Sequence, residues 1–244
     1  MAMDLKKSFA SVVLEKSIAT AVTIPTEGVL LSRVVEAGVE KVRPSAAAGS
    51  EVVVGFSMTN NEQPATTPVI ESLTAPTFVS ATAPMQLAHT NLVGTNPSVE
   101  IRIVDTTTST TLTQVASATN PNEFSVDNLT GIVTLVVGQS GHALTVYYRR
   151  NLTVVESQQL FFQPNVNNTS GAVLGLVGVF TGKGQMFTME YDASKDYSVA
   201  SPAIVTGASG KITIGGGGTS ITSLMRVIKA PTASDLSLGL EFNI

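Results

Sequence analysis

The sequence predicts an all-β protein, and three observations support this. Thr occurs thirty times in 244 residues, often beside Val, Ile or Leu, and β-branched residues suit a pleated sheet better than a helix. Short apolar runs alternate along the chain with turns rich in Gly, Pro, Asn and Ser. The content of 43% hydrophobic and 13% charged residues is typical of a folded globular chain. We expect a small β-barrel or β-sandwich body, an inserted Ig-like β-sandwich domain and a short N-terminal helix or arm.

Composition also excludes several classes of function. Cys is absent, so the chain has no disulfide, no thiolate nucleophile and no Cys-based zinc site. The net charge of −4 and the absence of a Lys/Arg stripe argue against direct nucleic-acid binding. No apolar run approaches the roughly 20 residues of a membrane-spanning helix, and we expect no export signal.

The N-terminal segment, residues 1–23, is predicted to form the helix or arm. Its apolar residues recur at near-helical spacing before Pro25, which is the first strong breaker. They are our candidate contact residues: Leu5, Phe9, Val12, Val13 and Ile18. Two alternatives stay open here: a helix packed on its own domain, or a terminal arm laid on another subunit.

The body is expected to be split between residues 24–66 and 156–244. Its first part predicts an antiparallel meander of strands at 29–35, 39–43 and 51–58, followed by a linker at 59–68 that contains two prolines. In its second part, turn glycines separate short strands between 171 and 244. LLSRVV near the start and SLMRVI near the end are each followed by a small-residue turn and a further strand, which favours one body built from both parts.

The middle region, residues 67–155, has its own regular spacing of strands and turns and is expected to be the inserted domain. Predicted strands arrive about every ten residues, as in β-sandwiches: 85–93, 99–105, 111–115, 122–127, 131–137 and 143–150. Val99, Ile101 and Ile103 alternate with Glu100 and Arg102. This is the period of a strand with one buried face.

Residues with catalytic potential are sparse. His89 and His142 have no His, Asp or Glu at i+2 or i+4, so both are predicted to be turn histidines. Asp192 and Asp196 lack the ligand pattern of a calcium loop, and the glycines at 215–218 enter a predicted strand and not a helix, unlike a phosphate loop. We therefore predict no catalytic, metal or cofactor residues and no enzymatic activity.

Two stretches carry a resemblance to a known family. GQMFTMEYDASKDYSVASPAIVTGASGKIT and MRVIKAPTASDLSLGLEF resemble the small β-barrel capsid cement or decoration proteins of tailed bacteriophages. The segments at 87–115, 124–137 and 144–149 look like a sandwich module of phage structural proteins. The resemblance implies a virion protein, made in the host cytoplasm, that binds the major capsid protein at subunit junctions, often as a homotrimer.

Two other functions fit the same composition. A tail-tube or baseplate subunit is also β-rich, free of Cys and self-assembling, but it would form rings or tubes by itself. A carbohydrate-binding adhesin would use the inserted sandwich as a lectin. Aromatic residues make up only 5% and Trp is absent, whereas sugar sites usually offer flat rings for stacking.

Overall fold

The computed structural model describes residues 3–24, 26–58, 66–153, 155–157, 175–199 and 201–244, with the backbone alone described for residues 3–13. The chain divides into two compact units. Unit 1 contains Met1–Ala65, Leu152–Pro231 and Ser237–Ile244, and unit 2 contains Thr66–Asn151 and Thr232–Leu236. The inserted domain expected from the sequence runs over 67–155. Each unit is described by itself below.

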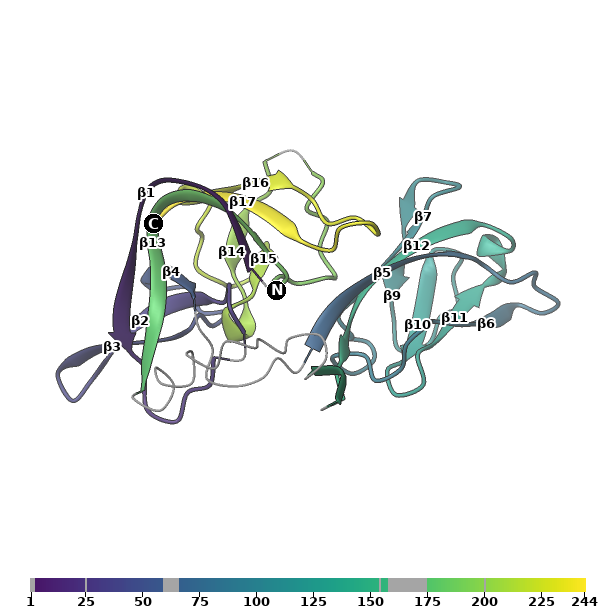
Figure 1. The fold of residues 1–244 in the computed structure, drawn as a ribbon. Helices are drawn as coiled ribbons and strands as arrows, with labels where there is room; N and C mark the ends of the chain where they lie inside the picture. The colour runs from purple at the N-terminus through teal and green to yellow at the C-terminus, as the bar shows by residue number, and fades with distance from the viewer. Residues whose placement is uncertain (1–2, 25, 59–65, 154, 158–174, 200) are drawn as a thin grey trace. The chain divides into compact units, whose positions relative to one another are not determined.

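Unit 1 is built on a seven-stranded sheet in the order β16-β17-β13-β4-β2-β3, with β1 paired to β13. A separate two-stranded sheet joins β14 to β15. The strands are β1 (Met3–Ser17), β2 (Leu30–Glu36), β3 (Val39–Pro44), β4 (Val53–Ser57), β13 (Leu176–Thr188), β14 (Ile204–Thr206), β15 (Ile212–Ile214), β16 (Met225–Lys229) and β17 (Leu238–Asn243), and the short helix η3 covers Ala208–Gly210. β13 is the central strand: β1 follows one of its edges, while β17 and β4 share the other (Figure 1).

Both faces of the large sheet are buried in its centre. On β2, Leu30 belongs to the main hydrophobic cluster and the next residue, Leu31, to a second, smaller cluster, because successive strand residues point to opposite faces. The main cluster gathers these buried residues: Leu30, Phe56, Phe180, Met186, Tyr191, Ala193, Tyr197, Ile204, Ile212, Ile221, Met225, Leu238, Leu240 and Phe242. The smaller cluster contains Ile24, Val29, Leu31, Val42, Val177 and Val179.

Three expectations for unit 1 are wrong in detail. Residues 3–17 form a strand and not a helix. β4 pairs back onto β2, which leaves β2 between β3 and β4, so the three strands are not a meander. β13 runs without a break through Gly182 and Gly184, although turn glycines were expected to separate short strands from residue 171 onward. Residues 59–65 of the expected linker and 171–174 lie outside the described residues.

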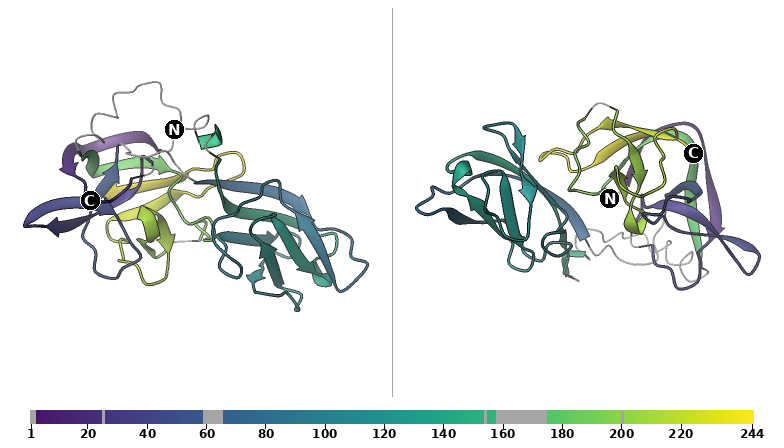
Figure 2. Two further views of the ribbon diagram at one scale, coloured as in Figure 1. Left: turned by 90° about the horizontal axis from the view of Figure 1, so that it is seen from below. Right: turned by 180° about the vertical axis from the view of Figure 1, so that it is seen from behind.

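Unit 2 consists of two four-stranded sheets, β6-β11-β10-β9 and β5-β12-β7-β8 (Figure 2). Its strands are β5 (Thr66–Thr74), β6 (Thr82–Gln86), β7 (Ile101–Asp105), β8 (Thr110–Thr111), β9 (Thr113–Gln114), β10 (Glu123–Asp127), β11 (Ile132–Val136) and β12 (Ala143–Asn151), and η1 covers Val137–Gln139. The hydrophobic core of unit 2, called the unit 2 cluster below, includes Val99, Ile101 and Ile103. The alternation predicted over 99–105 is therefore confirmed.

Unit 2 also contains a buried charge. The Arg149 side chain is fully buried, and its guanidinium donates from Nε to Glu100 Oε1 at 3.2 Å and from Nη1 to Thr66 Oγ1 at 3.0 Å. A buried cation requires such partners, because desolvation penalises a lone charge. These contacts join β12 to the start of β5 and to the residue before β7.

The all-β prediction is confirmed, since strands dominate both units and form antiparallel sheets. Of the two shapes expected for the body, a closed barrel is not found in the part of the chain that the structure describes.

The expected linker extended too far, because residues 66–68 already belong to β5. Pro68 lacks an N–H but fits there, since β5 is an edge strand that pairs, among the described residues, with β12 alone. The strand expected at 85–93 is β6, which ends at Gln86.

Candidate functional site

The candidate contact residues lie on β1 or directly after it. β1 is antiparallel to β13 from Met3 opposite Thr188 to Ser17 opposite Leu176. Leu5 is opposite Met186, Val12 opposite Thr181 and Val13 opposite Phe180, while Phe9 lies at a register shift. The side chains of these four residues lie outside the described set. The backbone of the predicted arm is therefore part of its own sheet.

Ile18, the fifth candidate, is half-buried and packs against the smaller cluster. Its backbone forms a parallel bridge to Val42, and the next residue, Ala19, donates its N–H to the Val42 carbonyl at 2.9 Å. Lys16 adds an ion pair to Glu40 of β3 at 2.9 Å. Ile18 thus anchors the end of β1 to β3.

The other edge of β1 is the first candidate surface. Within the described residues, β1 has a strand partner only on its β13 side, apart from the bridge at Ile18. An edge strand of 15 residues presents a row of N–H and C=O groups that another polypeptide can pair with. Natural sheets usually keep such edges short or covered, so this edge is suited to a partner.

The histidines differ from the sequence prediction in one respect. The His89 ring lies 6.4 Å from the ring of Tyr148, centroid to centroid. His142, which was expected to be an isolated turn residue, lies with Nδ1 2.6 Å from Oδ2 of Asp105. The Asp105 carboxylate also accepts the backbone N–H groups of Thr107 and Thr108. Burial acts to raise the pKa of Asp105, but the hydrogen bonds from His142 and Thr108 outweigh it and lower the pKa.

The His142–Asp105 pair joins the β7–β8 turn to the start of β12. A catalytic dyad needs a nucleophile within hydrogen-bond reach of the second ring nitrogen. Among the described residues, no hydroxyl group forms a hydrogen bond with the His142 ring. The contact itself links the end of β7 to the residue before β12.

Asp192 and Asp196 are occupied by their own turns. Asp192 accepts the N–H and the hydroxyl of Ser194 on Oδ1 and the Thr213 hydroxyl on Oδ2. Asp196 accepts the N–H and hydroxyl of Ser198. Across the described residues, no three His, Asp or Glu side chains gather closely enough to hold a metal ion.

The glycines at 215–218 form the turn that follows β15. The chain then returns to β14, where Ser220 pairs with Val205. No helix follows the turn, so it lacks the N–H cradle of a phosphate loop.

No helix among the described residues is long and apolar enough to cross a membrane.

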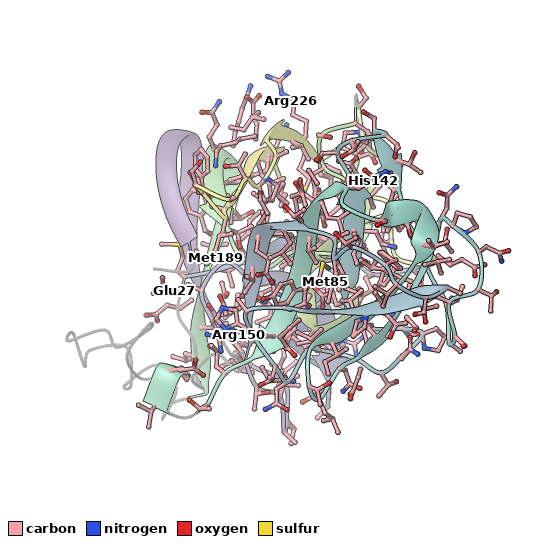
Figure 3. The ribbon with its side chains drawn as sticks, turned by 90° about the vertical axis from the view of Figure 1, so that its right-hand side faces the viewer. Glu27, Met85, His142, Arg150, Met189 and Arg226 are labelled. Atoms are coloured by element: carbon pink, nitrogen blue, oxygen red, sulfur yellow. The ribbon has the colours of Figure 1, made fainter. Side chains whose placement is uncertain are left out.

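A groove of about 660 Å³ in unit 1 is the second candidate surface, and sequence reasoning did not find it. It lies between β16 and the loop that contains Tyr197 and Pro202, and its lining is Tyr197, Ser198, Val199, Ser201, Pro202, Thr222, Met225, Arg226, Val227, Ile228, Lys229 and Ala230. Arg226 extends away from the strand into solvent (Figure 3). The sequence signal for this groove was the strand β16 with its cations at 226 and 229. The loop that forms the other wall lies about 25 residues earlier in the chain, so a local pattern does not connect the two.

No protein-family model, curated protein or solved structure matches this chain.

Proposed function

We propose that this chain is a non-enzymatic virion structural protein that binds the outer surface of an icosahedral phage capsid at subunit junctions. There it stabilises the shell against the pressure of packed DNA. The observation that carries the proposal is where the residues of the sequence resemblance lie. They run from the second half of β13 into β15 and from β16 to β17, and apart from Thr232–Leu236 they lie in unit 1. The main cluster is built largely from them.

The mechanism of stabilisation follows from the binding of one rigid body to two or more subunits. A standard interface buries about 800 Å² on each partner, and two contacts on one body add avidity without new types of contact. Separating the subunits then requires breaking both contacts. Repeated over many copies, individually weak contacts make a strong shell.

The proposed partners are the major capsid protein and other copies of this chain, assembled as a homotrimer on the capsid surface. The open edge of β1 supports a contact by strand pairing. The β1 residues proposed to lie at this contact are Leu5, Phe9, Val12 and Val13. Because Ile18 packs against the smaller cluster, its role is to fix β1 in position.

The test is reconstitution on filled capsids that lack this protein. We expect stoichiometric, many-copy binding, and we expect decorated particles to retain their DNA at temperatures that empty bare ones. Absence of binding, or binding without an effect on DNA release, would refute the proposal.

Electron microscopy and a glycan array test the two alternatives. Rings or tubes formed by the purified protein alone would favour a tail-tube or baseplate subunit. Specific hits on a glycan array would favour an adhesin.

A further inference from the structure

The groove along β16 combines three features of a peptide-binding site. The first is its shape: it follows a strand of five residues, which is about 17 Å long, and its volume is about 660 Å³. Val199, Pro202 and Ile228 give it apolar walls, and Val199 and Ile228 are 47% and 40% exposed.

The second feature is the open edge of β16. Leu224 accepts the Asn243 N–H across the β16–β17 ladder. In an antiparallel ladder, residues whose N–H and C=O point toward the partner strand alternate with residues whose groups point away. Met225 follows this pattern, since its N–H is directed to the Ile221 carbonyl. By the same alternation, the N–H and C=O of Val227 point away from β17.

The third feature is charge. The lining contains two cations, Arg226 and Lys229, and no Asp or Glu. The Arg226 side chain is 72% exposed and pairs with Glu241 at 3.1 Å. An exposed pair of this kind contributes little to stability, so the guanidinium can exchange Glu241 for the carboxylate of a ligand at small cost.

Lys229 is held at the wall of the groove by its neighbours. Its ammonium lies 5.6 Å from the centroid of the Phe187 ring and donates to the Ser237 carbonyl at 3.4 Å. Beneath it, Gly239 leaves no room for a side chain, because a Cβ there would meet Lys229 and Phe187. Close packing at Gly239 therefore places the start of the Lys229 side chain, and the Ser237 carbonyl and the Phe187 ring hold its ammonium.

From these features we infer that the β16 groove binds an extended, acidic segment of a partner polypeptide by strand addition. The segment pairs its backbone with Val227 and directs carboxylates to Arg226 and Lys229. Main-chain hydrogen bonds supply affinity in this mode, and side-chain contacts supply specificity. A second β16 is a poor occupant, because two copies would bring four cations into one groove. The inference does not depend on capsid binding, since β1 and β16 are different edges of the sheet.

Fluorescence anisotropy with labelled peptides tests this on the full chain. The probe is the peptide TEVEVET, and the matched peptides are TKVKVKT, with the charge reversed, and TEPEPET, in which proline removes backbone donors. The variant is Arg226→Gln with Lys229→Gln. The control is Arg33→Gln with Arg43→Gln, which removes the same charge from β2 and β3 without touching the groove.

We expect TEVEVET to bind the wild-type chain and to lose about fivefold or more in affinity with the groove variant, from the loss of two charged contacts. The control should change affinity less than about twofold, because its cations lie outside the groove. TKVKVKT and TEPEPET should bind weakly, and the Val227 amide should shift in NMR spectra with TEVEVET alone. If the double variant melts early, Arg226→Gln by itself replaces it, because that side chain is mostly exposed.

Three results would each overturn the inference. One is no binding of TEVEVET to the wild-type chain at about millimolar concentration, the weak limit for a specific contact. Another is equal binding of TKVKVKT. The third is an equal loss of affinity in the β2–β3 control, since this would show only a response to net charge.

Discussion

At the scale of single residues, the four consecutive glycines at 215–218 illustrate how similar residues differ in their constraints. A Cβ on Gly218 would overlap the backbone carbonyl oxygen of Thr206, whereas a Cβ on Gly217 would meet nothing. We expect Gly218→Ala to destabilise the chain by about 1–3 kcal/mol through overpacking. Gly217→Ala is the matched control and should stay within about 0.5 kcal/mol of wild type. Denaturant unfolding measures both, and equal stabilities would contradict the close approach to Thr206.

Glu123 is a residue whose contribution to stability should depend on pH. Its carboxylate accepts the Asn120 side chain and the backbone N–H groups of Thr119 and Asn120, and these hydrogen bonds lower its pKa from 4.5 to about 2. A lowered pKa means that the carboxylate stabilises the fold fully above about pH 4.5 and loses this effect as the pH falls toward 2.

Glu123→Gln removes this titration but keeps one oxygen, which can accept the two backbone N–H groups that now reach Oε2. Between pH 4.5 and 2, we expect the free energy of unfolding to fall less steeply with pH for Glu123→Gln than for wild type. The difference between the two slopes should correspond to the binding of up to about one proton. Glu15→Gln changes the same charge at an exposed position on β1 and serves as control. Parallel pH profiles for wild type and Glu123→Gln would show that the hydrogen bonds to Glu123 are not specific to the folded state.

Residue patterns predicted local structure well and distant contacts poorly. The alternation at Val99, Ile101 and Ile103 was enough to predict a half-buried strand, because both the pattern and its cause are local. The contact of His142 with Asp105 joins residues 37 positions apart. No short-range pattern reports on such a pair, because sheet pairing decides which turns meet.

At the scale of elements, β1 shows why the helix was one of the two forms predicted for a segment that is a strand. Its pairing with β13 shifts register between Leu5 and Lys7 and again between Ser8 and Ala10. Each bulge inserts a residue and breaks the two-residue period. The apolar spacing therefore drifts toward that of a helix. In β13 the wrong expectation was a turn. Gly182 and Gly184 favour turns, but they lie within a strand that has partners on both edges.

The pairing of β1 changes what a truncation should do. For a free arm, deletion would leave the body intact. Because β1 pairs with β13 along the whole length of β13, we expect deletion of residues 1–17 to open this edge and lower the melting temperature of unit 1 by at least about 5 °C. Hydrogen exchange should rise at β13 amides and stay unchanged in unit 2, for example at Val146. Unchanged β13 protection would restore the free-arm interpretation.

At the scale of the whole molecule, the chain enters and leaves the main segment of unit 2 at neighbouring points. Thr66 and Asn151, the first and last residues of that segment, are direct partners in the β5–β12 ladder, so they lie about 5 Å apart. An insertion with adjacent ends requires little rearrangement of its host. The unit 2 cluster draws all its buried members from this same segment.

We therefore expect residues 66–151 to fold when expressed alone. Both four-stranded sheets and the Arg149–Glu100 pair lie inside this fragment, and Thr232–Leu236, which it lacks, contributes nothing to the unit 2 cluster. The fragment should show a cooperative thermal transition, dispersed amide signals in NMR spectra and slow exchange at Ile103 and Val146, which are fully buried. Ile103→Asn in the same fragment is the control for loss of the core and should abolish the transition. A fragment without cooperative melting would mean that unit 2 depends on the rest of the chain, because its own core and ladders would then be insufficient to offset the entropy of ordering it.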